Sequence, residues 1–254
     1  MSVDVELDEG VATLTLNRPE TRNALSDGFL EELVDQLQAL DRSREVGCIV
    51  IAGQQRFFSA GADLGELSAR EPIEIFLGRR AELWRAVREV RVPLVAAVSG
   101  HCLGGGCELA LSCDLIVASR TARFGQPETG LGLIPGGGGS PLLVRLVGRA
   151  VAADMVLTGR RLSAEEAHER GVVARLSDEG DWLDQARAVA AEIASRPRVG
   201  QLLAKQVLSA ALELPLSGGI AFERASYQVA LASSDAREGL AAFTGNRDPV
   251  WRGR

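Results

Sequence analysis

Two glutamates stand beside glycine-rich turns, and their setting indicates acid–base chemistry. Glu108 follows the glycine run 104–106 and one cysteine, and Glu128 follows the sequence Phe-Gly-Gln-Pro. A carboxylate and a carboxylic acid placed together can take a proton from one reacting group and give a proton to another. Bare backbone amides at a helix start have no intrahelical partner and lie at the positive end of the helix dipole, so they can hold an oxygen that gains negative charge. This stretch therefore predicts a reaction centre with an anion hole.

Each glutamate taken alone has a simpler interpretation. Glu108 would complement a helix dipole, and Glu128 would be a loop carboxylate in a surface salt bridge. Their joint occurrence beside two glycine-rich turns favours catalysis over two coincidences. Two nearby carboxyls resist double ionisation, so we expect the pair to share one proton.

The elements that must position these residues alternate between strand and helix. Short apolar runs predict buried strands over 46–52, 93–99 and 114–119, and apolar spacing predicts helices over 73–90 and near 105–112. The small-residue loop 53–63 follows the first of these strands, at the edge where open α/β sheets place ligands. After the glycine-rich segment 130–139, Ser140-Pro141 predicts a helix start, with Ser140 as the cap.

The two ends of the chain complete an α/β plan. Alternating apolar residues over 3–16 predict a hairpin, and Ser26 is expected to cap the following helix. A capping box at Ser163 predicts a helix over 163–170, followed by a strand over 172–176. From Trp182 onward the pattern is helical, with breaks expected at 196–197 and 217–219.

Composition excludes several classes of protein. A net charge of −6 argues against general nucleic-acid binding, which needs a basic face. No segment approaches the ~18 apolar residues of a membrane span, and the acidic N-terminus has no apolar leader segment. The four cysteines show neither CxxC pairing nor a histidine cluster, so we expect no metal site, buried thiols and a cytoplasmic location. Lys205 is the single lysine, which leaves phosphate recognition to arginines or backbone amides.

Familiar nucleotide and hydrolase motifs are absent from the sequence. It contains no GxGxxG, no GxxxxGK[ST] and no GxSxG, which argues against a dinucleotide-binding protein, a P-loop protein and a serine hydrolase. His101 beside the glycine run is a candidate to line the site. His168 near a helix end is expected to have a structural role.

Several segments resemble the enoyl-CoA hydratase/isomerase, or crotonase, superfamily in its order along nearly the whole chain. They are NRPETRNALS (17–26), FFSAGADL (57–64), SGHCLGGGCELALSCDL (99–115), ARFGQPETGLGLIPGGGG (122–139), LTGRRLSAEEAHERGVV (157–173) and AREGLAAF (236–243). The resemblance implies an α/β fold, a crotonase-like spiral of ββα units over 1–196. It also implies a C-terminal helical region over 197–254 that builds a homotrimer or a homohexamer made of two trimers.

The resemblance also assigns roles to residues. The oxyanion-hole amides correspond to Ala62 and Gly105, the catalytic pair to Glu108 and Glu128, and the amide of Gly136 is expected to help hold water. The positions expected to contact coenzyme A are Arg18, Arg22, Ala60, Asp63, Leu64, Phe243 and Arg247. The chain departs from the family where lysines are frequent, with Gly65 and Glu66 after the GAD segment and Asn246 after Phe243.

The implied activity is addition of water across the 2,3-double bond of a trans-2-enoyl-CoA, giving a 3-hydroxyacyl-CoA. Coenzyme A is then part of the substrate, and no separate cofactor is expected. The alternatives are an enoyl-CoA isomerase, lyase or dehydratase of the same superfamily, or a noncatalytic acyl-CoA-binding or RNA-associated scaffold. Retention of both glutamates argues against the scaffold. Acyl length, branching, product stereochemistry and pathway depend on segments 65–80 and 140–147, which the sequence does not position.

Overall fold

The strands form two sheets among residues 2–253, which the computed structural model describes. The six-stranded sheet has the order β1-β2-β3-β5-β7-β10, and the four-stranded sheet has the order β4-β6-β8-β9. All neighbours run parallel except the β1–β2 hairpin and the β8–β9 pair. The strands are β1 (Val3–Asp8), β2 (Val11–Leu16), β3 (Cys48–Ala52), β4 (Phe57–Ser59), β5 (Leu94–Val98), β6 (His101–Leu103), β7 (Leu115–Ser119), β8 (Arg123–Gly125), β9 (Arg161–Ser163) and β10 (Arg175–Ser177).

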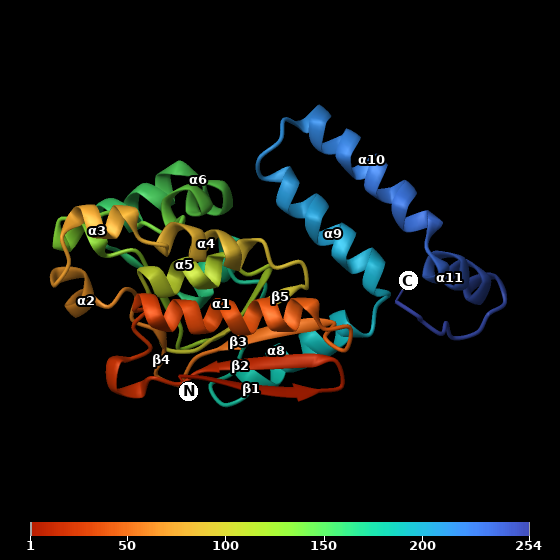
Figure 1. Cartoon of the computed structure of the whole chain (residues 1–254), viewed down its shortest axis with the longest axis horizontal. Helices are drawn as coiled ribbons and strands as arrows, with labels where there is room; N and C mark the ends of the chain where they lie inside the picture. Colours follow the sequence, from red (N-terminus) through yellow and green to blue (C-terminus); the bar gives the residue numbers. More distant parts are fainter. Residues whose placement is uncertain (1, 254) are drawn as a thin grey trace.

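The helices cover both faces of the larger sheet and continue into a C-terminal extension (Figure 1). They are α1 (Asp27–Arg42), α2 (Leu64–Ser68), α3 (Pro72–Leu77), α4 (Arg80–Arg88), α5 (Gly105–Leu111), α6 (Gly139–Thr158), α7 (Ala164–Glu169), α8 (Trp182–Ala194), α9 (Arg198–Ala211), α10 (Leu216–Ala232) and α11 (Ser234–Thr244). Two 3₁₀ turns, η1 (Pro19–Thr21) and η2 (Glu128–Leu131), lie in the connections.

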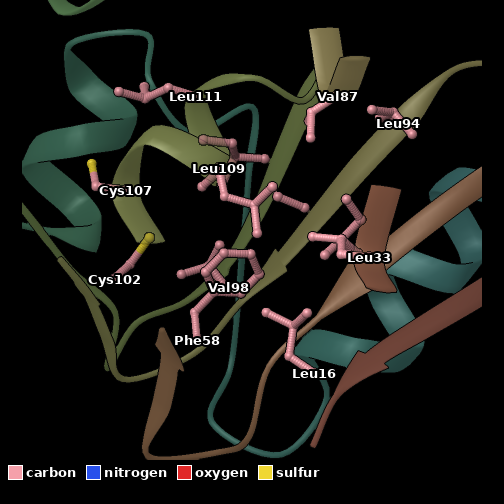
Figure 2. Packing of buried hydrophobic residues seen from close by; sticks show 14 of the residues in the cluster. Leu16, Leu33, Phe58, Val87, Leu94, Val98, Cys102, Cys107, Leu109 and Leu111 are labelled. Atoms are coloured by element: carbon pink, nitrogen blue, oxygen red, sulfur yellow. The ribbon is translucent and has the colours of Figure 1, made fainter. Parts of the chain in front are cut away.

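Alternate residues of the central strands enter two separate apolar clusters. On β3, Ile49 and Ile51 face the main core with α1, α4 and α5, whereas Cys48 and Val50 face α8. Figure 2 shows Phe58, Val98 and Leu109 among the buried side chains of the main cluster. Burial on both faces explains why these strands appear as continuous apolar runs in the sequence. The four cysteines are free thiols, as expected, and burial raises the pKa of Cys48 to about 12.

A strand–strand–helix unit recurs along the middle of the chain. The strands β3, β5 and β7 enter the larger sheet, and each is followed by a short strand, β4, β6 or β8, in the smaller sheet. A helix then follows each pair, at α2, α5 and α6 respectively. The unit places the ends of β4, β6 and β8 side by side.

Four boundaries expected from the sequence are wrong. The helix expected over 73–90 is two helices, because α3 ends at Gly78 and α4 begins at Arg80. Ser140 is not a cap, since α6 begins at Gly139 and Gly138 is its N-cap residue. The strand expected over 172–176 is β10 at Arg175–Ser177. Residues 217–219 do not break the helical region, because they form the first turn of α10 after Pro215.

The helices α9, α10 and α11 project from the layered part of the molecule (Figure 1). Their exposed apolar side chains include Leu208, Leu216, Tyr227, Val229 and Phe243. The chain leaves the layered part between α8 and α9, where the domain boundary at 196 was expected, and that division stays a prediction. No helix of residues 2–253 is both long and apolar enough to cross a membrane.

Candidate active site

Three segments of the site leave neighbouring strands of the smaller sheet at the same edge. The strands β4, β6 and β8 are parallel neighbours, so their carboxyl ends meet. The loop after β4 carries Ala62, the turn after β6 carries Gly105, and the loop after β8 carries Glu128. Ligands of parallel sheets bind at such an edge. The structure therefore brings together the hole residues and the second glutamate.

The amides of Ala62 and Gly105 lie next to each other. A Cβ atom placed on Gly105 would lie 3.4 Å from the Ala62 nitrogen. An isolated β-bridge joins Leu25 to the loop that carries Ala62. Its hydrogen bonds involve the Gly61 carbonyl and the Asp63 amide, so the bridge does not use the Ala62 amide. Gly105 is the first residue of α5, where an amide has no intrahelical acceptor. Both N–H groups are thus available to one external oxygen.

Close backbone contact at Gly106 holds the two halves of the hole together. A Cβ atom on Gly106 would lie 2.5 Å from the Ser59 carbonyl oxygen, so only glycine lets α5 approach the end of β4 this closely. The side chain of Asn23 donates to the Phe58 carbonyl at 2.9 Å, and the Ser59 hydroxyl donates to the Asn23 carbonyl at 2.7 Å. These contacts fix the loop that carries Ala62.

The Gly105→Ala variant tests the hole directly. Its methyl group would meet neighbours at ordinary van der Waals distances of 3.4–3.6 Å, so we expect the variant to fold. The methyl group would occupy space beside the Ala62 amide, and loss of one hole donor typically lowers kcat by about 10²–10³. Steady-state kinetics on a short enoyl-CoA, with circular dichroism as the folding control, checks this expectation. Wild-type kcat in a folded variant would contradict the placement of the hole.

Glu108 is buried and is held by a loop distant in sequence. Its Oε1 accepts hydrogen bonds from the amides of Gly137, at 2.7 Å, and Gly139, at 2.8 Å. The residue is 3% exposed. Since both bonds go to Oε1, the second oxygen remains available for a proton.

Glu128 points back toward the hole. A Cβ atom on Gly104 would lie 3.1 Å from its Oε1. Burial, and secondly the negative charge of Glu108, raises the pKa of Glu128 to about 7. A carboxyl group with such a pKa is protonated in a large fraction of the molecules near neutral pH. One glutamate is therefore suited to the base role and the other to the acid role.

The sequence did not single out Gln126, which connects the two glutamates. The neighbours of the Gln126 side chain decide which of its two amide atoms is the nitrogen. This nitrogen donates to Glu128 Oε1 at 2.9 Å and Oε2 at 3.2 Å. The same side chain packs against Gly139, beside Glu108. The only sequence signal is its place between Gly125 and Pro127, two residues before Glu128, since its complete burial is visible in the structure alone.

The loop amides also refine the expectation for Gly136. The amides that contact Glu108 belong to Gly137 and Gly139, whereas Gly136 is exposed next to them. A role for the Gly136 amide in holding water stays a prediction.

Residues expected to bind coenzyme A divide between two parts of the molecule. Near the hole, Ala60 and Leu64 are exposed, while the Asp63 side chain caps α2 by accepting from the Glu66 amide at 3.2 Å. Arg22 is exposed and lies beside the loop that carries Ala60, because its carbonyl oxygen accepts a hydrogen bond from the Ala60 amide at 2.9 Å. Arg18 is engaged internally, with its guanidinium donating to the Ser26 hydroxyl at 3.0 Å.

The other two expected contacts lie on the C-terminal extension. Phe243 on α11 is 86% exposed, and Arg247 forms a paired ion contact with Glu238 at 2.6 and 2.9 Å. In Figure 1, α11 lies at the end of the molecule opposite α2 and α3. Within one chain, this part is not brought together with the hole.

The histidines lie outside the reaction centre. His101 begins β6 and is exposed, whereas the hole lies at the other end of that strand. A ring nitrogen of His168 contacts the Val173 carbonyl at 2.8 Å, which fits a structural role. No group of three or more His, Cys, Asp or Glu side chains in the described part of the chain is placed to hold a metal ion.

A pair of free amides, with one carboxyl group of raised pKa beside them and a second, buried carboxyl group on the helix that begins at Gly105, is suited to acid–base chemistry on a substrate that develops an oxyanion. Comparison with known proteins agrees. The model of the enoyl-CoA hydratase/isomerase family matches residues 6–254. A Rhizobium meliloti (strain 1021) protein named "Probable enoyl-CoA hydratase" is 44% identical over 98% of this chain and 97% of its own. The 2,3-dehydroadipyl-CoA hydratase of Escherichia coli K12 is 40% identical, with 98% of each chain covered.

Solved structures lead to the same group. An enoyl-CoA hydratase subunit from Geobacillus kaustophilus HTA426 superposes with a TM-score of 0.97 at 38% identity, covering 100% of this chain and 99% of its own. The chain therefore belongs to the enoyl-CoA hydratase/isomerase family. The resemblance and the crotonase-like α/β fold expected from the sequence are confirmed.

Proposed function

We propose that the protein is an enoyl-CoA hydratase that adds water to a trans-2-enoyl-CoA. The observation that carries the proposal is the presence of two carboxyl groups beside the paired amides, one of them with a pKa raised to about 7. Hydration needs a base for the water and an acid for the α-carbon, and this site offers both. The relatives named as hydratases support the same reaction.

The proposed reaction uses each group once. The thioester oxygen binds to the amides of Ala62 and Gly105, and the Glu108 carboxylate takes a proton from water as its oxygen bonds to the β-carbon. The electrons of the double bond move to the thioester oxygen. Each amide donor lowers the activation free energy of this addition by about 3–4 kcal/mol. The enolate then takes the Glu128 proton at the α-carbon. Transfer of one proton from Glu108 to Glu128 resets the pair, so no cofactor other than the coenzyme A of the substrate is needed.

Incubation with crotonyl-CoA tests the reaction through loss of the enoyl absorbance. We expect hydration with little conversion of a 3-enoyl-CoA into a 2-enoyl-CoA. Isomerisation without hydration would identify an isomerase, and no turnover of either substrate would favour the lyase or dehydratase alternative. A panel of acyl chain lengths would then define the substrate.

Coenzyme A recognition is proposed to depend on arginine in place of lysine. Arg22 lies next to the loop that carries Ala60 and Ala62. Partial burial, and then the charges of Arg161, Arg22, Arg123 and Arg56, lower the pKa of His101, so these four cations lie around one part of the surface. Such a group of cations on an acidic protein suits the phosphates of coenzyme A. Asp63 and Leu64 would border the same end of the ligand.

We also propose a homotrimer or a dimer of trimers in the cytoplasm. Exposed apolar side chains on α9, α10 and α11 would be covered by other subunits, as large apolar surfaces usually are. Association would also let Phe243 and Arg247 reach the coenzyme A of another subunit. A mass of three or six times 26.9 kDa, measured by analytical ultracentrifugation, would support this assembly.

A further inference from the structure

The position of Glu108 depends on the connection between η2 and α6. Both hydrogen bonds to its Oε1 come from the end of this loop, through the amides of Gly137 and of Gly139, the first residue of α6. The helix that carries Glu108 supplies the backbone, but the loop fixes the carboxylate. Whatever holds Gly137 therefore also sets the direction of the base.

Helix α4 holds Gly137 by two contacts. Arg88 Nη1 donates to the Gly137 carbonyl oxygen at 2.7 Å. The Trp84 ring lies against the same residue so closely that a Cβ atom there would be 2.6 Å from a ring carbon. Trp84 and Arg88 are four residues apart on α4, so they present one side of the helix to the loop.

The helix itself is anchored in the main apolar cluster. Leu83, Trp84 and Val87 are buried there, at 4%, 3% and 0% exposure. Arg88 continues this line of contacts outward to the loop. By contrast, Arg85 on the same helix pairs with Glu89 at 3.7 Å, with both side chains largely exposed.

We infer that Arg88 is a positioning residue for Glu108, because it fixes Gly137 so that the two loop amides hold the carboxylate toward the water. This inference rests on the proposed hydration reaction. A charged donor to a carbonyl is stronger than a neutral one, and the bond is partly shielded from solvent. Loss of the bond frees the loop while leaving the hole and Glu128 in place.

Two reactions separate this role from a general effect on folding. Hydration of crotonyl-CoA needs Glu108, whereas exchange of the α-protons of butyryl-CoA in deuterated water needs only the hole and Glu128. We expect Arg88→Met to lower kcat for hydration between about tenfold and hundredfold, the cost of a base displaced by a fraction of an ångström to 1 Å. The KM and the exchange rate should stay within about twofold of wild type. Arg88→Lys, which keeps a cationic donor, should recover part of the loss.

Amide hydrogen exchange of segment 136–140 provides a readout that does not depend on catalysis. It should become faster in Arg88→Met and remain unchanged in the control Arg85→Met, which removes only an exposed ion pair. Unchanged hydration and unchanged amide protection in Arg88→Met would overturn the inference. An equal loss of hydration and α-proton exchange would also overturn it, because Arg88 would then support only the fold. Wild-type protein that does not hydrate crotonyl-CoA would overturn the proposed function instead, and amide exchange would still decide the link between Arg88 and the loop.

Discussion

Replacing Glu128 by Gln is expected to lower kcat for hydration by about 10²–10⁴, the usual contribution of a positioned general acid. The amide cannot deliver a proton to the α-carbon, but it has nearly the same shape, and its oxygen can still accept a hydrogen bond from the side-chain nitrogen of Gln126. We therefore expect a folded protein that retains substrate affinity. Wild-type kcat in this variant would show that the α-carbon takes its proton from another group.

The pH dependence of the wild-type protein should report the same carboxyl group. Burial and the charge of Glu108 raise the pKa of Glu128 to about 7. The acid is protonated below this value, so kcat/KM for hydration should fall as the pH rises through about 7. In Glu128→Gln this alkaline limb should disappear from the residual activity.

Glu128→Gln should also stabilise the fold at alkaline pH. The folded-state pKa of about 7 lies above 4.5, the ordinary value for a glutamate in an unfolded chain, so the folded protein binds this proton more tightly than the unfolded chain does. The protonated carboxyl supports the fold below pH 4.5, and that support is lost as the pH rises through about 7. At pH 8 the variant should be more stable than wild type by about 1–2 kcal/mol, allowing for solvent screening of a half-buried group.

Urea unfolding at pH 5 and pH 8 measures this difference in the free energy of unfolding. The control is Glu169→Gln, at an exposed position on α7, which should match wild type at both pH values. A variant that is less stable than wild type at pH 8 would contradict the raised pKa.

The larger sheet could be predicted from the sequence because its strands are buried on both faces. Runs such as 46–52 and 93–99 are apolar without interruption, and the structure places β3 and β5 there. The smaller sheet was not predicted. Its strands β4, β6 and β8 have three residues each, too few for a pattern of period two to stand out.

The smaller sheet determines how the site is arranged. The loop that carries Ala62 does not follow the strand over 46–52 directly, as the sequence suggests, because β4 lies between them and pairs with β6. The pairing of β4, β6 and β8 explains why Ala62, Gly105 and Glu128 meet, although they are widely separated in sequence. Motifs alone identified these residues, whereas the sheet supplies the reason for their arrangement.

The contacts around Glu108 could not be predicted because they depend on tertiary packing. Nothing in the spacing of Trp84, Arg88 and Gly137 indicates that a helix and a glycine loop meet. The excess of glycine in runs such as 130–139 suggests close approach of the backbone, but not to which group. In the structure Gly137 and Gly139 are buried and their amides hold the Glu108 carboxyl group.

Replacing Glu108 by Gln should separate the two proton transfers. The Gln side-chain oxygen can still accept from the amides of Gly137 and Gly139, but the amide cannot take a proton from water. We expect kcat for hydration to fall by about 10²–10⁴. Exchange of the α-protons of butyryl-CoA should persist, since Glu128 and the hole remain.

The pH profile of this exchange tests the coupling between the glutamates. In exchange Glu128 acts as the base, so the rate should rise with pH through the Glu128 pKa, about 7 in wild type. Removing the Glu108 charge lowers that pKa, although burial, the larger cause, keeps it above the ordinary glutamate value of 4.5. The midpoint of the exchange profile should therefore move to lower pH in Glu108→Gln. An unchanged midpoint would mean that the charge of Glu108 does not affect the pKa of Glu128.

The Glu108→Ala variant provides the matched comparison for the loop. It removes the acceptor of two buried amides, and a buried donor left without a partner costs about 1–3 kcal/mol. We expect Glu108→Ala to be less stable than Glu108→Gln by at least about 1 kcal/mol in urea unfolding, with equally low hydration.

The double variant Glu108→Gln/Glu128→Gln should lose exchange as well. Its rate of hydration should fall little below that of the less active single variant, because the effects of residues that act as a unit are not additive. A strictly additive loss in hydration would show instead that the two glutamates work independently.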